Sequence, residues 1–222
     1  MKPVVVMTQT NDVQSDLVSI IHKPFIEVKP LAFDLNLLDR HYDWLIFSSK
    51  NAVKYFYNYL NRLNVDYIAV IGVKTAQYCE SLGIHVDYMP SDFSQEGFLE
   101  GFNKKNQKIL IPSSQLARPL LLETLSKENE VIKLDLYTSI PNKQNIQDVK
   151  KMIQHQHIDA LTFSSSSAVR YYFNEGTVPK FQDYYAIGEQ TARTIKANKQ
   201  PVTIADTQTL ESLIQKILES RG

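Results

Sequence analysis

Apolar and polar positions along the chain predict strands and helices in regular alternation. Short apolar segments, rich in β-branched and aromatic residues, predict ten strands at residues 4–6, 25–28, 44–47, 67–71, 84–88, 109–111, 131–137, 160–163, 185–187 and 202–205. Apolar residues at helical spacing predict helices at residues 12–22, 52–60, 75–82, 96–104, 147–154, 168–173, 191–197 and 210–218, and one near Pro119. Strands that alternate with helices favour parallel sheets covered on both faces, the doubly wound α/β class.

An internal duplication organises this pattern. Residues 43–58, DWLIFSSKNAVKYFYN, return at residues 159–174 as DALTFSSSSAVRYYFN, a shift of 116 (159 minus 43). The same shift carries Gly72-x-x-Thr75-Ala76 onto Gly188-x-x-Thr191-Ala192. The 222 residues therefore predict two units of roughly 110 residues with five strands each.

The pairing of the ten strands stays open at this point. Each unit could fold contiguously, or the first two strands of one unit could complete the last three of the other. The stretches that would then cross between the domains are residues 29–41 and 138–158, which lie at the same place in each unit.

Composition indicates an ordinary soluble protein and excludes a strongly basic or acidic one. Hydrophobic residues make up 43%, and 24 Lys and Arg balance 24 Asp and Glu. No global field would recruit nucleic acid or an anionic membrane, and no apolar run predicts a signal peptide or a spanning helix, so we expect a cytoplasmic protein. The only cysteine, Cys79, is expected to be a buried, inert thiol.

Small polar residues follow four of the predicted strands. The pairs Ser48-Ser49 and Ser164-Ser165 can cap the next helix, and the free N–H groups of a first helical turn attract anions. Gly72 and Gly188 would permit a tight turn and close ligand approach, while a threonine caps the helix or binds the ligand. Four helix N-termini could thus face one anionic ligand, although each feature taken alone is better explained as a simple cap or turn.

Other chemistries find no support in the sequence. The serines lack a G-x-S-x-G elbow, and neither G-x-G-x-x-G nor a Walker motif is present. No Cys/His/carboxylate spacing predicts a metal site, and no cofactor is expected. Basic residues near the predicted helix starts could supplement the amides: Lys50, Lys54, Lys74, Arg118, Arg170 and Arg193.

Several segments, in this order and spacing, resemble the uroporphyrinogen-III synthase family over essentially the whole chain. They are DWLIFSSKNAV, AVIGVKTA with LGIHVDYMP, KILIPSSQLARPLLLETL, LDLYTSI, DALTFSSSSAV, AIGEQTA and VTIADTQTLESLIQKI. The resemblance implies two flavodoxin-like domains, segment-swapped and joined by two linkers, with the active site in the cleft between them. One domain would combine residues 1–33 and 142–222, and the other would span residues 34–141.

The resemblance also implies a lyase of haem biosynthesis that works without a cofactor, as a monomer. It would remove water from hydroxymethylbilane, a linear tetrapyrrole with eight carboxylates, and close it through a spiro intermediate with inversion of ring D. Ring closure also occurs without enzyme, giving the uninverted isomer, so the protein's task would be to hold a reactive conformation and stabilise developing charge.

Site residues follow from the resemblance position by position. Tyr137 matches the tyrosine that the family places near the departing hydroxyl, which implies a general-acid role. Cleft positions match Ser48, Ser49, Gly72, Thr75, Ser164, Ser165, Gly188 and Thr191. Many relatives carry Arg-Gly after the strand-ending proline, whereas Pro112 here is followed by Ser113-Ser114, so a carboxylate contact at Ser113 is not implied.

Two other functions fit the same residues. A two-domain binding protein could close on an anionic small molecule without reacting it, and a regulatory α/β protein could use the fold only as a scaffold. Tyr137 could equally be a tyrosine packed at the end of a strand.

Overall fold

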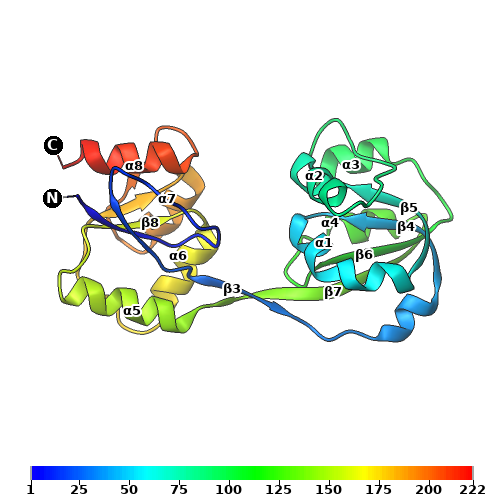
Figure 1. The fold of residues 1–222 in the computed structure, drawn as a ribbon, viewed down its shortest axis with the longest axis horizontal. Coiled ribbons are helices and arrows are strands. Elements are labelled where there is room, and N and C mark those ends of the chain that lie inside the picture. Colours follow the sequence, from blue (N-terminus) through cyan, green and yellow to red (C-terminus); the bar gives the residue numbers. More distant parts are fainter. Residues whose placement is uncertain (1, 222) are drawn as a thin grey trace. The chain divides into compact units, whose positions relative to one another are not determined.

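A computed structural model describes residues 2–221 of the chain. Two compact units result: unit 1 comprises Met1–Glu27 and Ile140–Gly222, and unit 2 comprises Val28–Ser139. Each unit contains one five-stranded sheet (Figure 1). In the described part of the chain, no helix is long and apolar enough to cross a membrane.

The sheet of unit 1 is parallel throughout. Its strands are β1 (Val4–Met7), β2 (Ser19–His22), β8 (Ala160–Phe163), β9 (Tyr184–Ala186) and β10 (Thr203–Ile204), in the order β2-β1-β8-β9-β10. If the five strands of this sheet are numbered from one to five along the chain, their order in the sheet is 2-1-3-4-5, which is the order of flavodoxin-like sheets. The helices are α5 (Lys143–Gln154), α6 (Ser166–Asn174), α7 (Glu189–Ala197) and α8 (Leu210–Glu219).

The sheet of unit 2 has the order β3-β7-β6-β4-β5. Its strands are β3 (Ile26–Pro30), β4 (His41–Phe47), β5 (Asn64–Val70), β6 (Lys108–Ser114) and β7 (Glu130–Pro141), and the pairs among β7, β6, β4 and β5 are parallel. Its helical segments are η1 (Leu35–Asp39), α1 (Lys50–Phe56), η2 (Tyr57–Arg62), α2 (Val73–Ser81), α3 (Gln95–Gly101) and α4 (Leu120–Leu125).

The duplication is visible in the strand order. A shift of 116 (159 minus 43) carries β4 onto β8 and β5 onto β9, and it carries Tyr88, which bridges Ala69, onto Ile204 of β10. The neighbours of the duplicated strands match as well, because β6 and β7 take the places of β1 and β2. The first two strands of the chain thus complete the sheet of its C-terminal part, which confirms the segment-swapped, flavodoxin-like fold that the resemblance implied.

Continuous apolar strands form because each sheet is covered on both faces. In unit 1 the neighbours Val5 and Val6 are both fully buried but belong to clusters on opposite faces of the sheet. In unit 2 Leu45 and Ile46 divide in the same way. A buried side chain at every position, rather than at alternate ones, is the expected pattern for a parallel sheet between helices.

Three predicted elements were wrong in kind or in place. The strand expected at residues 25–28 forms as β3 but lies in the sheet of unit 2, so β2 and not this strand is the second strand of unit 1. Residues 12–22 form no helix: Leu17 is 57% exposed, and Ile20 and Ile21 belong to β2, paired with β1. Three β-branched residues within four positions, starting at Val18, favour the strand over the helix.

The strand expected at residues 84–88 is reduced to the single bridge between Tyr88 and Ala69. The side-chain carboxylate of Asp87 accepts from the backbone N–H of Ile68 at 2.7 Å. A longer ladder between β5 and this segment would use the N–H of Ile68 for a main-chain hydrogen bond. Because the Asp87 carboxylate takes this N–H, the pairing does not extend further.

The chain passes between the units in two places. The boundaries between the units fall inside β3 and inside β7, which are neighbours in the sheet of unit 2. Beyond the end of β3, the backbone N–H of Leu31 donates to the carbonyl of Leu136 at 3.0 Å.

Candidate functional site

The carboxyl end of β8 leads directly into α6. Ser165 has an extended backbone (φ −154°) and caps the helix, since its Oγ accepts from the N–H of Ala168 at 3.3 Å. Ser164 lies between the buried Phe163 and this cap. The serine pair therefore ends the strand and begins the helix, as its cap role predicted.

The next helix, α7, begins without a side-chain cap. Gly188 is its N-cap residue, with an extended φ of −171° that any residue can adopt. The absence of a side chain matters instead for space, because a Cβ at Gly188 would lie 3.1 Å from Cγ and Cδ of Gln208. Glycine here leaves room for Gln208 at the edge of the sheet.

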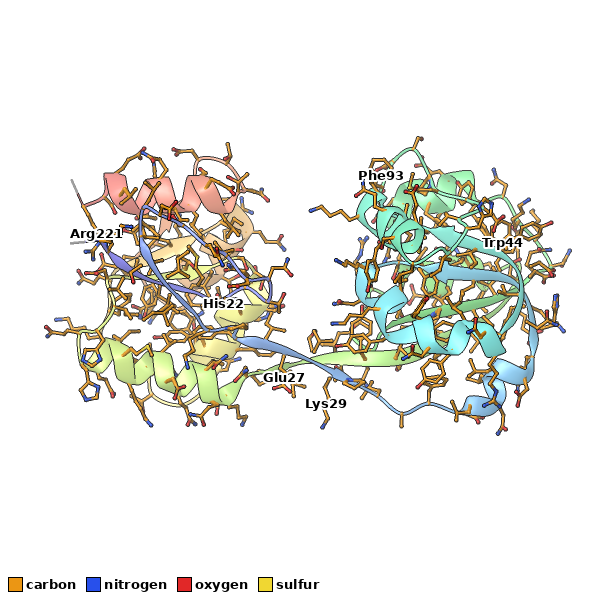
Figure 2. The ribbon with its side chains drawn as sticks, viewed as in Figure 1. His22, Glu27, Lys29, Trp44, Phe93 and Arg221 are labelled. Carbon is orange, nitrogen blue, oxygen red and sulfur yellow. The ribbon has the colours of Figure 1, made fainter. Side chains whose placement is uncertain are left out.

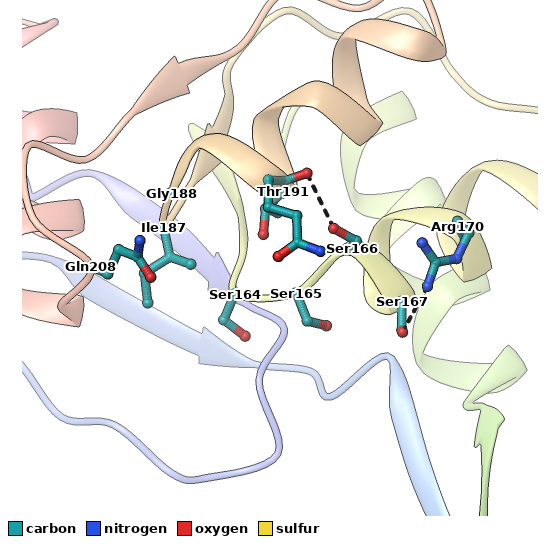
Figure 3. Close-up of a pocket in the computed structure, with 10 residues that line it drawn as sticks. Ser164, Ser165, Ser166, Ser167, Arg170, Ile187, Gly188, Thr191 and Gln208 are labelled. Carbon is teal, nitrogen blue, oxygen red and sulfur yellow. Dashed lines mark hydrogen bonds between the residues drawn. The ribbon is translucent and has the colours of Figure 1, made fainter. Parts of the chain in front are cut away.

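These two helix starts line one pocket of about 360 Å³ in unit 1. Figure 3 shows Ser166, at the start of α6, directed toward the first turn of α7, where its hydroxyl donates to the carbonyl of Gln190 at 3.2 Å. Gln208 lies beside Ile187 in the same view. The lining residues are Ser164, Ser165, Ser166, Ser167, Arg170, Ile187, Gly188, Gln190, Thr191 and Gln208. The structure thus brings together the four predicted site residues of this unit: Ser164, Ser165, Gly188 and Thr191.

The pocket favours an anion. Its one charged lining residue is Arg170, whose guanidinium donates to Oγ of Ser167 at 3.0 Å, and its lining includes no carboxylate, imidazole or thiol. Two helix N-termini add a partial positive charge of roughly half an elementary charge each. Hydroxyl and amide groups supply hydrogen bonds but no metal-binding cluster, so the pocket fits a carboxylate better than a cation.

In unit 2 the equivalent serine has a second partner. Ser49 caps α1, accepting from the N–H of Ala52 at 3.2 Å, and its Oγ lies 2.9 Å from the hydroxyl of Tyr137. Tyr137, on β7, is 6% exposed and stacks against Tyr55 with ring centroids 5.3 Å apart. Burial raises the pKa of the Tyr137 hydroxyl, although the hydrogen bond to Ser49 opposes that rise.

The other predicted residues of unit 2 are more dispersed. Gly72 is the N-cap of α2, without a side-chain cap, and Thr75 is buried in the first turn. Ser48 lines a separate hollow of only about 10 Å³ together with Ser113 and Arg118. The two copies of the motif therefore share their backbone plan but differ in the open space beside it.

The threonines do not cap their helices. Thr75 and Thr191 occupy the third helical position after the capping glycines, and both are 5% exposed. The cap interpretation of the threonines is therefore wrong, and ligand binding by their hydroxyls stays a prediction. Gly72 also has an extended backbone (φ −126°), so a left-handed backbone requires glycine at neither position, although the chain bends at both.

Most of the basic residues near the helix starts are engaged elsewhere. Arg118 forms an exposed ion pair with Glu96 at 2.8 Å, and Arg193 hydrogen bonds to Glu189 at 3.4 Å. Lys50 Nζ lies 4.6 Å from the ring centroid of Tyr78. Arg170 alone among these cations lines the larger pocket.

Sequence reasoning missed Gln208, Gln190, Ser166 and Ser167. Gln208 precedes α8, whose cap Thr209 follows β10, so it lies at the same carboxyl edge as the serine and glycine motifs. The rule that ligands of open α/β sheets bind beyond the carboxyl ends of the strands could have found it. Cys79 is fully buried, and burial raises the pKa of its thiol to about 11, as expected for an inert residue.

Comparison with known proteins shows which family the sequence resembles. The sequence model of the family described as uroporphyrinogen-III synthase HemD matches residues 15–215. A porphyrin biosynthesis protein HemD of Ruminiclostridium josui is 29% identical over 227 residues, which cover 91% of this chain and 44% of that protein. The uroporphyrinogen-III synthase of Synechococcus elongatus is 28% identical over 167 residues, covering 68% of this chain and 63% of that protein.

The chain thus spans about half the length of these two curated relatives. Among solved structures, uroporphyrinogen-III synthetase from Helicobacter pylori superposes with a TM-score of 0.67 at 17% identity and covers 100% of both chains. A uroporphyrinogen III synthase from Thermus thermophilus gives a TM-score of 0.60 at 15% identity, covering 92% of this chain and 88% of that one. At these identities the likeness supports the two-domain α/β fold.

Proposed function

Because the chain belongs to the uroporphyrinogen-III synthase family, we propose that it cyclises hydroxymethylbilane to uroporphyrinogen III, with loss of water and inversion of ring D. The observation that carries this proposal is the pocket of unit 1, where two helix starts and Arg170 offer donors and positive charge to an anion. The substrate presents eight carboxylates. A binding edge without acidic side chains is what such a polyanion requires.

Substrate binding is proposed to use the carboxyl edges of both sheets. In unit 1 the residues are Ser164, Ser165, Gly188 and Thr191, to which we add Arg170 and Gln208. In unit 2 they are Ser48, Ser49, Gly72 and Thr75. Backbone N–H groups at the uncapped starts of α2 and α7 would donate to propionate or acetate oxygens, because a glycine N-cap leaves these groups without a side-chain acceptor.

Tyr137 is proposed as the group that donates a proton or a hydrogen bond to the departing hydroxyl. Ser49 Oγ already accepts from the Ala52 N–H, so its own proton is free to be donated to the phenol oxygen of Tyr137. In this arrangement the phenol would keep its own proton for the leaving oxygen. Because burial raises the pKa of Tyr137, the phenol keeps its proton at neutral pH.

In the remaining steps the protein is proposed to position the reacting rings of the substrate, with little need for further catalytic side chains. Loss of water leaves an azafulvene, which ring D attacks within the same molecule to form the spiro intermediate. If the protein holds the two ends of the linear tetrapyrrole in this geometry, it removes most of the entropic cost of ring closure. No cofactor is part of the proposed reaction.

We also propose that the protein acts as a monomer in the cytoplasm, without nucleic acid or membrane partners. Its balanced charge, 24 basic against 24 acidic residues, supports the lack of nucleic-acid and membrane partners. A single buried cysteine agrees with a reducing compartment.

The test is to supply freshly prepared hydroxymethylbilane, oxidise the products and separate the isomers. Predominant type III product supports the proposal, and type I product at the rate of the protein-free control contradicts it. Saturable binding of hydroxymethylbilane without a change in isomer ratio would instead identify a binding protein for anionic small molecules.

A further inference from the structure

The first residues of β4 and β5 bring together three side chains that the proposed reaction does not use. Ligand atoms of His41, Asp43 and Asp66 all lie within 4.8 Å of one another, and Nε2 of His41 is 3.1 Å from Oδ1 of Asp66. His41 and Asp43 are two residues apart on β4 and therefore point to one face. No sequence spacing predicted this group, because its members come from two strands.

The two carboxylates face each other across the strand pair. Trp44, labelled in Figure 2, lies in the middle of β4 and pairs with Tyr67, and this register places Asp43 opposite Asp66. Like charges at directly opposed positions destabilise a sheet. Throughout residues 2–221, no lysine or arginine forms an ion pair with either carboxylate, and His41 is the one basic partner.

The duplication supplies an internal comparison. The shift of 116 (159 minus 43) carries the three residues onto His157, Asp159 and Gln182 of unit 1. There Oδ1 of Asp159 accepts from Arg221 at 2.8 Å, and the second acid is replaced by the neutral amide of Gln182. Unit 1 thus neutralises this position with an arginine, whereas unit 2 leaves two acids beside a histidine.

One of the contacts has the same purpose in both copies. Asp159 Oδ2 accepts from the backbone N–H of Val4 at 2.8 Å, and Asp43 Oδ2 accepts from that of Lys108 at 2.6 Å. This bond ties neighbouring strands and explains the first aspartate in each unit. It does not explain Asp66, which is specific to unit 2, and it holds the Asp43 carboxylate in place with one oxygen still available.

We propose that His41, Asp43 and Asp66 bind a divalent transition-metal ion, with Zn²⁺ or Co²⁺ as the best fit. One imidazole nitrogen and two carboxylate oxygens are a usual set for these ions, whereas Mg²⁺ and Ca²⁺ prefer oxygen ligands alone. Water completes the coordination, since His41 and Asp66 have side chains 44% and 48% exposed. The site lies at the beginning of β4, the opposite end from Ser49, so the ion would brace the β4–β5 pair and take no part in the reaction.

The experiment titrates tag-free protein with Co²⁺, followed by the visible absorption of the bound ion, and then displaces it with Zn²⁺. The proposal predicts one saturable site and a rise in melting temperature with Zn²⁺ but not with equal Mg²⁺. Asp66→Asn, which gives unit 2 a neutral amide like that of unit 1, should weaken Co²⁺ binding at least about tenfold. Far-ultraviolet circular dichroism verifies that this variant is folded.

His157→Ala is the matched control, because it removes the equivalent histidine of unit 1, which stacks on His155 with centroids 5.6 Å apart. This variant should bind Co²⁺ as the unsubstituted protein does. Unchanged affinity in Asp66→Asn, or loss of binding in His157→Ala, would overturn the proposal. The readouts do not involve turnover, so they succeed or fail independently of the proposed function.

Discussion

The hydroxyl of Tyr137 lies 2.9 Å from Oγ of Ser49, the residue that caps α1. One serine thus connects the end of β4, the first turn of a helix and the phenol proposed to act on the substrate. The equivalent Ser165 of unit 1 caps α6 through the same bond to the third residue beyond it, Ala168. Substitutions in the two copies can therefore separate the loss of a helix cap from the loss of the contact with Tyr137.

Replacement of Tyr137 by phenylalanine should slow turnover about a hundredfold, the lower range for loss of a general acid, with little change in KM. The ring remains stacked on Tyr55, so the fold should persist. Steady-state kinetics on hydroxymethylbilane measures both parameters. Tyr42→Phe is the control, because it removes a buried hydroxyl that donates to the Leu37 carbonyl at 2.9 Å, and it should leave turnover unchanged. An equal rate for Tyr137→Phe and Tyr42→Phe would remove Tyr137 from the mechanism.

The pH dependence of turnover follows from the direction of the Tyr137 pKa. Burial raises this pKa above its ordinary value of about 10, and the protonated phenol is the active form. Activity that depends on Tyr137 should therefore be constant from neutral pH up to about 9 and fall only at higher pH. The ratio of the rates of the unsubstituted protein and Tyr137→Phe, measured across this range, checks the prediction. A ratio that falls between pH 7 and 8 would contradict it.

The serine caps should differ in their effects on stability and on turnover. Ser49→Ala and Ser165→Ala each remove one cap and should each lower the free energy of unfolding by about 1 kcal/mol. Only Ser49→Ala also removes the partner of Tyr137. Its loss of turnover should therefore exceed the loss that removal of a helix cap alone would cause. Urea unfolding and kinetics on both variants test this difference. Ser94→Ala, which removes the cap of α3, provides the control for a cap outside the candidate site.

Arg170 should contribute to substrate affinity. Arg170→Gln removes the one charged residue that lines the pocket of unit 1, and we expect KM to rise roughly tenfold, with a smaller dependence on salt. Arg193→Gln is a matched control, since Arg193 is exposed and hydrogen bonds to Glu189 instead. Equal KM values for the two variants would place the anion elsewhere.

Gly188 should be sensitive to a single methyl group. A Cβ at this position would lie 3.1 Å from the Gln208 side chain, so Gly188→Ala should displace Gln208 and narrow the pocket. We expect KM to rise several-fold while the melting temperature changes little, because the contact is with a flexible side chain. The double variant Gly188→Ala/Gln208→Ala removes the crowding. If crowding of Gln208 is the cause, the double variant should have the same KM as Gln208→Ala alone; a higher KM in the double variant would show that the methyl group acts in another way.

The sequence predicted the α/β class and the duplicated strands because their signals are local and strong. The four buried residues Ala160–Phe163 form β8 with the predicted bounds, and Gly83 ends α2 with a positive φ of 73°. The sequence predicts a helix at residues 12–22 because Leu17, Ile20 and Ile21 have helical spacing. Pairing of β2 with β1 decided the structure there, and such a long-range contact leaves no local pattern.

The candidate site was predicted in part for a related reason. Ser164 and Thr191 were found because they belong to repeated motifs, and the structure brings them to one pocket. Gln208 belongs to no repeat and reaches the pocket only through the placement of β10 at the edge of the sheet. His41 and Asp66 were missed likewise, since only the β4–β5 register brings them together.

Inversion of ring D is the central claim, and carbon NMR tests it directly. Hydroxymethylbilane labelled with ¹³C at the carbon that joins rings C and D, and at the ring-D carbon bonded to it, carries a one-bond coupling between the two labels. Inversion through the spiro intermediate breaks this bond, and the bridge then bonds to the other α-carbon of ring D. Our account predicts that the protein's product loses the coupling while the protein-free product keeps it. A product that retains the coupling in the presence of the protein would contradict the proposed function.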